Sequence, residues 1–146
     1  LETRYRTLAA RFHPDRYAAA SAFEQKQAVM MSATVNEAYH TLKNPTDRAA
    51  YLLKQQGIDA DAPEHTSFAP EFLMQQMEWR ETLAEARAAG DTAALNALEP
   101  QVSAEQTALY GQLAAAFDAQ QYQTAAQLVR QGRFLNKMRQ EIENAV

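Results

Sequence analysis

The sequence contains no cysteine, only four glycines and five prolines, and no long run of apolar residues. The absence of cysteine excludes disulfide bonds and thiolate ligands for zinc or an iron–sulfur cluster. Without about 20 consecutive apolar residues, the sequence offers no membrane-spanning helix, and we expect no membrane partner. It also lacks a glycine-rich phosphate loop, strand-like alternation and internal repeats. The expected fold class is therefore all-α.

The first sixteen residues combine a short amphipathic helix with an excess of positive charge. Four arginines stand against two acidic residues here, a net charge of +2 in a chain of net charge −4. The arginines Arg4, Arg6 and Arg11 lie beside or opposite the apolar stripe, so we expect them to face solvent or a partner. The apolar stripe follows the spacing of one helical face. It consists of Leu1, Tyr5, Leu8 and Phe12.

The tripeptide His13, Pro14, Asp15 follows this helix. Proline disfavours helical backbone in the preceding residue, so the helix should end at His13 and leave the tripeptide in a loop. Ser21 and Glu24 then match a capping box, which predicts a second helix up to about residue 43. Taken alone, the tripeptide could be an ordinary junction between helix and loop, where proline and aspartate are common. The alternative is a contact point for a specific partner.

Catalysis at the tripeptide is a competing interpretation. His13 could act as a general base with Asp15 as its orienting carboxylate. However, no serine or cysteine nucleophile stands beside them, and Pro14 makes a mutual hydrogen bond awkward. His40 and His65 lack the spacing of metal ligands. We therefore expect no catalytic residue, metal site or cofactor, and no enzymatic activity.

The remaining sequence predicts further helices and one linker. Asn44 and Pro45 begin a short helix that Gly57 closes. Residues 58–69 are polar and show no apolar periodicity, so they form the predicted linker.

Three long helices are predicted after this linker. They lie at 70–90, 91–118 and about 122–143. Pro100 should bend or interrupt the second of them. The expected architecture is a helical hairpin with a short helix, followed by a three-helix bundle of long antiparallel helices. The corresponding domains are residues 1–57, the linker 58–69 and residues 70–146.

Acidic residues concentrate in the middle of the chain. Residues 59–118 hold eleven acidic side chains and two arginines, a net charge of −9, whereas residues 119–146 hold four basic and two acidic side chains. Nucleic-acid binding would require a basic face on the bundle, so we expect no nucleic-acid partner. The pattern suits a first domain that approaches an acidic partner and a bundle that approaches a basic one.

The helix predicted at 70–90 has more apolar surface than one face can bury. Its expected core stripe is Phe72, Trp79, Leu83 and Ala86. A second apolar sector lies about 100° or more around the helix axis and is bordered by carboxylates. This sector and its border comprise Leu73, Met74, Met77, Glu78, Glu81 and Glu85. Such a patch is typical of an adaptable protein-binding surface. The open alternative is that Leu73 and Met77 are core residues of a helix packed on two sides.

Two antiparallel helices, the first of them basic, with His-Pro-Asp in the connecting loop resemble a J domain. Further runs extend along nearly the whole chain: SATVNEAY at 32–39, TLKNP at 41–45, RAAYLL at 48–53, FLMQQME at 72–78, RE at 80–81 and RFLNK at 133–137. Together they resemble the HscB family, J-type co-chaperones of iron–sulfur cluster assembly. The first helix of a J domain is missing ahead of Leu1, and the sequence begins without methionine inside a helical pattern, so we expect either an N-terminal truncation or further residues ahead of Leu1 in the protein. The family usually also extends somewhat beyond Val146.

The resemblance implies a cytoplasmic protein with two partners. Its J domain would stimulate the ATPase of HscA, a DnaK-like chaperone, and its bundle would deliver the scaffold protein IscU to that chaperone, aiding cluster maturation and transfer. The implied chaperone-binding residues are Arg4, Arg6, Arg11, His13, Pro14 and Asp15. The implied scaffold-binding residues are Leu73, Met74, Met77, Glu78, Glu81, Glu85 and Phe134. By periodicity alone, Phe134 is a residue at the edge of the core. The alternatives are a J-type co-chaperone with another client and a helical adaptor without a chaperone partner.

Overall fold

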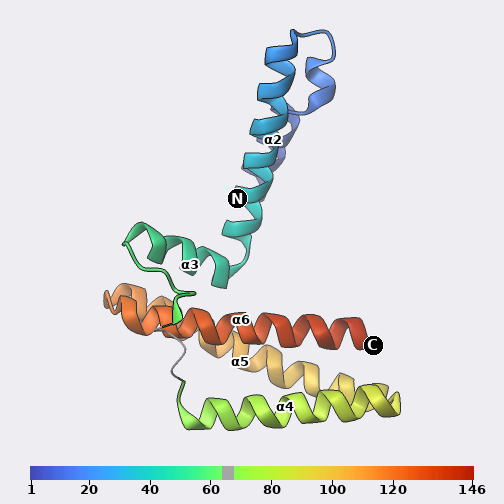
Figure 1. Ribbon diagram of the computed structural model, residues 1–146, viewed down its shortest axis with the longest axis vertical. Helices are drawn as coiled ribbons and strands as arrows, with labels where there is room; N and C mark the ends of the chain where they lie inside the picture. Colours follow the sequence, from blue (N-terminus) through green and yellow to red (C-terminus); the bar gives the residue numbers. More distant parts are fainter. Residues whose placement is uncertain (64–67) are drawn as a thin grey trace. The chain divides into compact units, whose positions relative to one another are not determined.

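The computed structural model describes residues 1–63 and 68–146, and this part of the chain contains helices and no β-strand (Figure 1). The predicted all-α fold is confirmed. Residues 64–67, which include His65 and part of the predicted linker, lie outside the described residues. The α-helices are α1 (Glu2–Arg11), α2 (Ala22–Lys43), α3 (Pro45–Gln55), α4 (Pro70–Ala89), α5 (Thr92–Asp118) and α6 (Tyr122–Ala145). A 3₁₀ helix, η1 (Pro14–Tyr17), lies between α1 and α2. No helix in the described ranges is long and apolar enough to cross a membrane.

The described chain forms two compact units, Leu1–Arg48 and Ala49–Val146. In the first unit, α1 and α2 pack as an antiparallel hairpin (Figure 1). The predicted cap of α2 is present, because the Ser21 hydroxyl accepts a hydrogen bond from the Glu24 amide at 3.2 Å. The apolar stripe of α1 is only partly covered by α2: Tyr5 is half-buried, whereas Leu1 and Leu8 are exposed.

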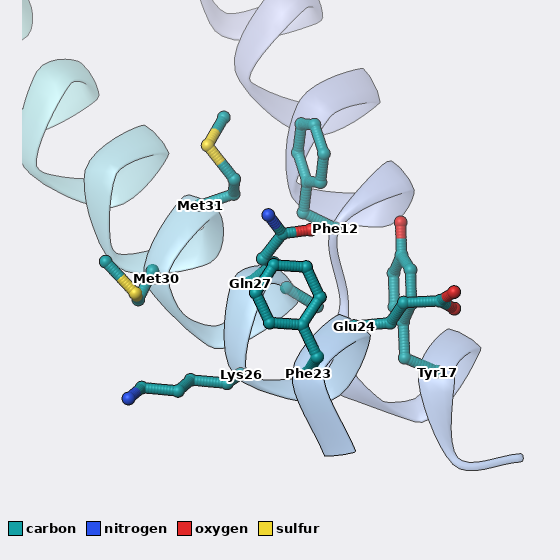
Figure 2. Close-up of a pocket in the computed structure, with 9 residues that line it drawn as sticks. Phe12, Tyr17, Phe23, Glu24, Lys26, Gln27, Met30 and Met31 are labelled. Atoms are coloured by element: carbon teal, nitrogen blue, oxygen red, sulfur yellow. The ribbon is translucent and has the colours of Figure 1, made fainter. Parts of the chain in front are cut away.

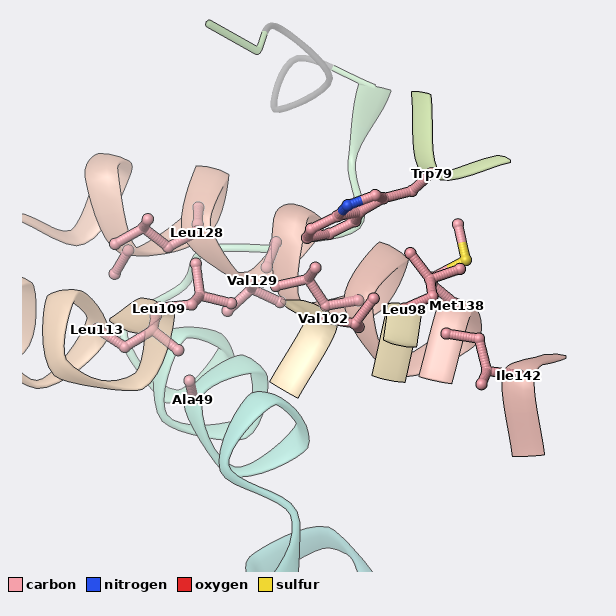
Figure 3. Close-up of a cluster of buried hydrophobic side chains, with 14 of the residues drawn as sticks. Ala49, Trp79, Leu98, Val102, Leu109, Leu113, Leu128, Val129, Met138 and Ile142 are labelled. Atoms are coloured by element: carbon pink, nitrogen blue, oxygen red, sulfur yellow. The ribbon is translucent and has the colours of Figure 1, made fainter. Parts of the chain in front are cut away.

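The second unit contains the predicted three-helix bundle of α4, α5 and α6, in which successive helices run antiparallel (Figure 1). Gly90 ends α4 with a left-handed backbone, φ +64°, which glycine adopts without a steric penalty. Asp91 then caps α5 by accepting a hydrogen bond from the Ala94 amide at 3.0 Å. Figure 3 shows the apolar side chains that meet between the helices. The buried cluster to which these side chains belong includes Trp79, Leu83, Leu98, Val102, Leu109, Leu113, Leu128, Val129, Leu135, Met138 and Ile142.

Pro100 does not interrupt α5, which runs as one helix from Thr92 to Asp118. The expected interruption is therefore wrong. Pro100 lies on the exposed side of α5, where the backbone carbonyl that loses its helical donor can bond to water. The buried positions on either side, Leu98 and Val102, remain in the bundle core.

The segment that follows Arg48 packs on the bundle. Ala49 and Leu53 of α3 and the later Ala60 are buried in the same apolar cluster as the bundle residues. Asp61 adds a polar contact, because its carboxylate accepts two hydrogen bonds from the Arg133 guanidinium, at 2.6 and 3.2 Å. The second unit therefore includes Ala49 and Leu53, which the sequence assigned to the first domain, and Ala60 and Asp61, which it assigned to the linker.

Candidate functional site

The tripeptide lies at the turn of the hairpin and begins a 3₁₀ helix. α1 ends at Arg11, and Pro14 occupies the first position of η1. His13 caps this turn, since its Nδ1 atom accepts a hydrogen bond from the Asp15 amide at 3.2 Å. The expected loop is therefore more ordered than sequence suggested, because proline pre-sets the backbone angle that the first helical residue needs.

His13 and Asp15 do not form a base with its orienting carboxylate. Nδ1 of His13 lies 3.7 Å from the nearer carboxylate oxygen of Asp15, which is too long for a hydrogen bond. The same nitrogen instead accepts a hydrogen bond from the Asp15 backbone amide. The Asp15 side chain is 93% exposed. The Asp15 carboxylate is therefore accessible to another molecule.

The three arginines that the resemblance assigns to chaperone binding lie along α1, and Arg11 is the one at the end next to the turn. Arg4, Arg6 and Arg11 are exposed on α1. Arg6 pairs with Glu2 at 2.8 Å, and the Arg11 guanidinium lies 5.4 Å from the centre of the Phe12 ring. An exposed ion pair such as Arg6–Glu2 contributes little to stability, so this guanidinium can reorient toward an acidic partner.

An open hollow with a mostly apolar lining lies where the end of α1, η1 and the beginning of α2 meet (Figure 2). Phe12 and Tyr17 line it from the end of α1 and from η1, and Phe23, Met30 and Met31 line it from α2. Phe23 and Met30 are 69% and 61% exposed. Sequence reasoning missed this feature. The signal that could have found it is the seven-residue spacing of Phe23 and Met30, which places both on one face of a helix.

The second predicted surface lies on α4. Leu73, Met74 and Met77 are 43%, 70% and 72% exposed. The alternative that places Leu73 and Met77 in the core is therefore wrong. The predicted core stripe of α4 is confirmed at Trp79, and also at Leu83 and Ala86, which are all buried.

Exposed carboxylates run beside these apolar residues. Glu78, Glu81 and Glu85 are all exposed, and their spacing of three and four residues aligns them along one side of α4. The face thus combines apolar contact area with negative charge. We call the set Leu73, Met74, Met77, Glu78, Glu81 and Glu85 the α4 face.

Phe134 of α6 lies half-buried against the core at the junction with α4. The edge of one ring meets the face of the other between Phe72 and Phe134, with ring centres 5.7 Å apart and planes at 86°. Phe72 itself is only partly buried, so the prediction that it belongs to the core stripe of α4 is wrong. The Arg80 guanidinium lies 5.2 Å from the centre of the Phe134 ring. Sequence reasoning did not connect Arg80 with Phe134, because no local pattern relates residues on different helices.

The two groups of predicted site residues lie in different units of the chain. His13, Pro14, Asp15 and the arginines of α1 belong to the first unit, and the α4 face and Phe134 belong to the second. Within the described residues, no cluster of three or more histidine, aspartate or glutamate side chains is arranged to hold a metal ion.

Comparison with known proteins gives two family matches. Residues 1–51 match the model of the DnaJ domain, and residues 68–143 match the model of the HSCB C-terminal oligomerisation domain. A relative from Neisseria meningitidis serogroup C, named Co-chaperone protein HscB homolog, is 68% identical over 146 residues, which are 100% of this chain and 88% of the relative.

Solved structures give the same result. The chaperone HscB from Vibrio cholerae is 39% identical, with a TM-score of 0.81 over 98% of this chain and 84% of the other. Human co-chaperone protein HscB is 32% identical, with a TM-score of 0.85 over 98% of this chain and 71% of the human one. The sequence matches and the shared fold agree, and this chain belongs to the HscB family of co-chaperones.

Proposed function

We propose that this chain is a J-type co-chaperone that stimulates the ATPase of an HscA-type, DnaK-like chaperone and delivers an IscU-type scaffold protein to it, aiding iron–sulfur cluster maturation and transfer. One observation carries the proposal: two unlike exposed surfaces stand on two separate units, a basic hairpin with a His-Pro-Asp turn and an apolar, acidic helix face. Unlike surfaces on separate units allow two partners to be held together, which raises their effective concentration.

Chaperone docking would use the turn and the basic helix. The exposed Asp15 carboxylate offers acceptors for an arginine or for backbone N–H groups of the chaperone. Pro14 limits the backbone conformations of the turn, and the bond from the Asp15 amide to His13 holds it further. The arginines of α1 would steer the hairpin onto an acidic surface and accelerate association.

Scaffold binding would use the α4 face together with Phe134. Leu73, Met74 and Met77 supply exposed apolar area, and methionine side chains adapt their shape to a partner. The three glutamates would contribute electrostatic complementarity to a basic scaffold surface. We place the chaperone-binding role in residues 1–57 and the scaffold-binding role in residues 70–146.

In this proposal the chemistry belongs to the partners. The chaperone hydrolyses ATP, and the scaffold carries the iron–sulfur cluster, for which this chain has no cysteine ligand. The chain itself is a cytoplasmic binding protein without a cofactor. Its contribution is to bring chaperone and scaffold together and to accelerate the chaperone's ATP hydrolysis.

The test is an ATPase assay with purified HscA-type chaperone, in which phosphate release is measured against the concentration of this chain, with and without an IscU-type scaffold. We expect stimulation by the chain, and faster hydrolysis with chain and scaffold together than with either alone. Calorimetry measures scaffold binding in parallel, with a generic unfolded protein as the comparison.

Each alternative has its own outcome in these two assays. Stimulation without scaffold binding would indicate a co-chaperone with another client. Scaffold binding without stimulation would indicate a helical adaptor. ATP hydrolysis by the chain with no chaperone present would show that the chain is itself an enzyme. Stimulation without scaffold binding, or scaffold binding without stimulation, would overturn the complete proposal.

A further inference from the structure

We propose that Arg80 is a positioning residue of the scaffold-binding surface, because it fixes the ring of Phe134 in the orientation that the scaffold contacts. This inference rests on the proposed function. Arg80 is not part of the α4 face. Its proposed role explains how an aromatic side chain of α6 is held next to the apolar residues of α4.

The ring of Phe134 is held from more than one direction. Phe72 meets it with ring planes at 86°, and the Arg80 guanidinium lies 5.2 Å from its centre. Both neighbours come from α4, eight residues apart, whereas Phe134 comes from α6. Phe134 also packs against the buried side chains of the bundle core. A side chain whose rotamer is fixed before binding loses less conformational entropy when the partner arrives.

Arg80 contacts the ring of Phe134 even though glutamates lie close to it on α4. Three exposed glutamates of α4 lie near it in sequence, yet among the described residues no carboxylate lies within ion-pair distance of its guanidinium. The guanidinium faces the aromatic ring instead, and such contacts draw on the negative face of the ring. Its N–H donors lie in the guanidinium plane, so they stay available to solvent or to the scaffold.

Arginine is better suited to this position than lysine. The guanidinium is flat and weakly hydrated and can stack on a ring, whereas an ammonium group is a compact, strongly hydrated charge. We therefore expect Arg80→Lys to keep part of the contribution that Arg80 makes to scaffold affinity, and Arg80→Gln to keep none of it. Arg87 lies on the same helix, exposed and near its C-terminal end, and provides a control with the same change of charge.

The experiment is a set of calorimetric titrations of an IscU-type scaffold with the wild-type chain, R80Q, R80K, R87Q, F134L and the double variant R80Q/F134L. We expect R80Q to weaken binding about two- to fivefold, R80K to fall between wild type and R80Q, and R87Q to match wild type. In the F134L background, R80Q should cause no further loss, because Arg80 acts through the ring. Thermal melting of each variant checks that the fold is kept.

Two results would overturn the proposal. R80Q could weaken scaffold binding equally in the wild-type and F134L backgrounds, or R80Q and R87Q could weaken scaffold binding equally. A measurement without scaffold separates this proposal from the proposed function. In the free chain, NMR should show the Arg80 δ-methylene protons shifted upfield by the Phe134 ring, and this shift should vanish in F134L. If the shift is absent, Arg80 does not position the ring. If it is present and wild type does not bind the scaffold, the proposed function fails, and the positioning role in binding fails with it.

Discussion

The ring of Tyr5 in α1 lies flat against the ring of Tyr39 in α2, with ring centres 3.9 Å apart and planes 14° from parallel. The Tyr5 hydroxyl also donates a hydrogen bond to the side-chain oxygen of Asn36 at 2.7 Å. One residue thus connects the two helices by an apolar contact and a polar one. The hairpin that presents the tripeptide depends on this connection, since buried side chains are few in the first unit.

Replacing Tyr5 by alanine should therefore destabilise the hairpin by about 1–3 kcal/mol, the combined effect of a lost aromatic pair and a lost hydrogen bond. Helicity measured against temperature by circular dichroism would show an earlier transition for the first unit. Tyr5→Phe keeps the ring contact and loses only the hydroxyl, so it should have less than half of that effect. Equal effects of the two variants would contradict the importance of the ring contact.

Asp15→Asn should abolish stimulation of the chaperone ATPase and leave the fold unchanged. The Asp15 side chain is 93% exposed, so the substitution should not disturb packing, and the proposed contact with the chaperone would lose its charged acceptor. The measurement is phosphate release by an HscA-type chaperone at saturating co-chaperone. Glu37→Gln removes an equal charge from an exposed position on α2 and serves as the control. Unchanged stimulation by the Asp15 variant would count against the J-domain mechanism.

Exchange of Leu73 and Met74 together for serine should weaken scaffold binding roughly tenfold or more, since exposed apolar residues at the centre of an interface carry much of its free energy. Chaperone docking and the melting temperature should change little, because both side chains are exposed. The matched control exchanges Val29 and Met30, an exposed apolar pair on α2, for serine. Joint loss of helicity and binding would mean that the α4 residues support the fold instead.

The helix ends could be predicted because they depend on local chemistry. Ser21 and Asp91 cap their helices as expected, and Gly90 adopts the left-handed backbone that closes α4. Of the bend or interruption expected at Pro100, the interruption is wrong, because α5 continues through this residue. Its cost depends on whether the freed carbonyl meets water, and this is a property of the folded surface rather than of the neighbouring sequence.

The candidate surfaces were predictable only in part. Periodicity identified the second apolar sector of α4, yet the exposure of Leu73 and Met77 depends on where α5 and α6 lie. The contact between Arg80 and Phe134 joins two helices, and that between Asp61 and Arg133 spans 72 residues of sequence. Such contacts have no periodic signature, because tertiary packing alone brings the side chains together.

Leu53 offers a test of where the bundle unit begins. Its side chain is fully buried with the bundle residues, although it belongs to α3 and precedes the predicted linker. Leu53→Ala should lower the free energy of unfolding of the second unit by about 2–5 kcal/mol, because it leaves a cavity in that core. Trp79 is the sole tryptophan and lies buried in the same cluster, so its fluorescence in urea reports this unit specifically. The neighbouring Leu52 is 41% exposed, and Leu52→Ala should shift the transition by less than about 1 kcal/mol. If the two variants unfold at the same urea concentration, Leu53 does not contribute to the core that surrounds Trp79.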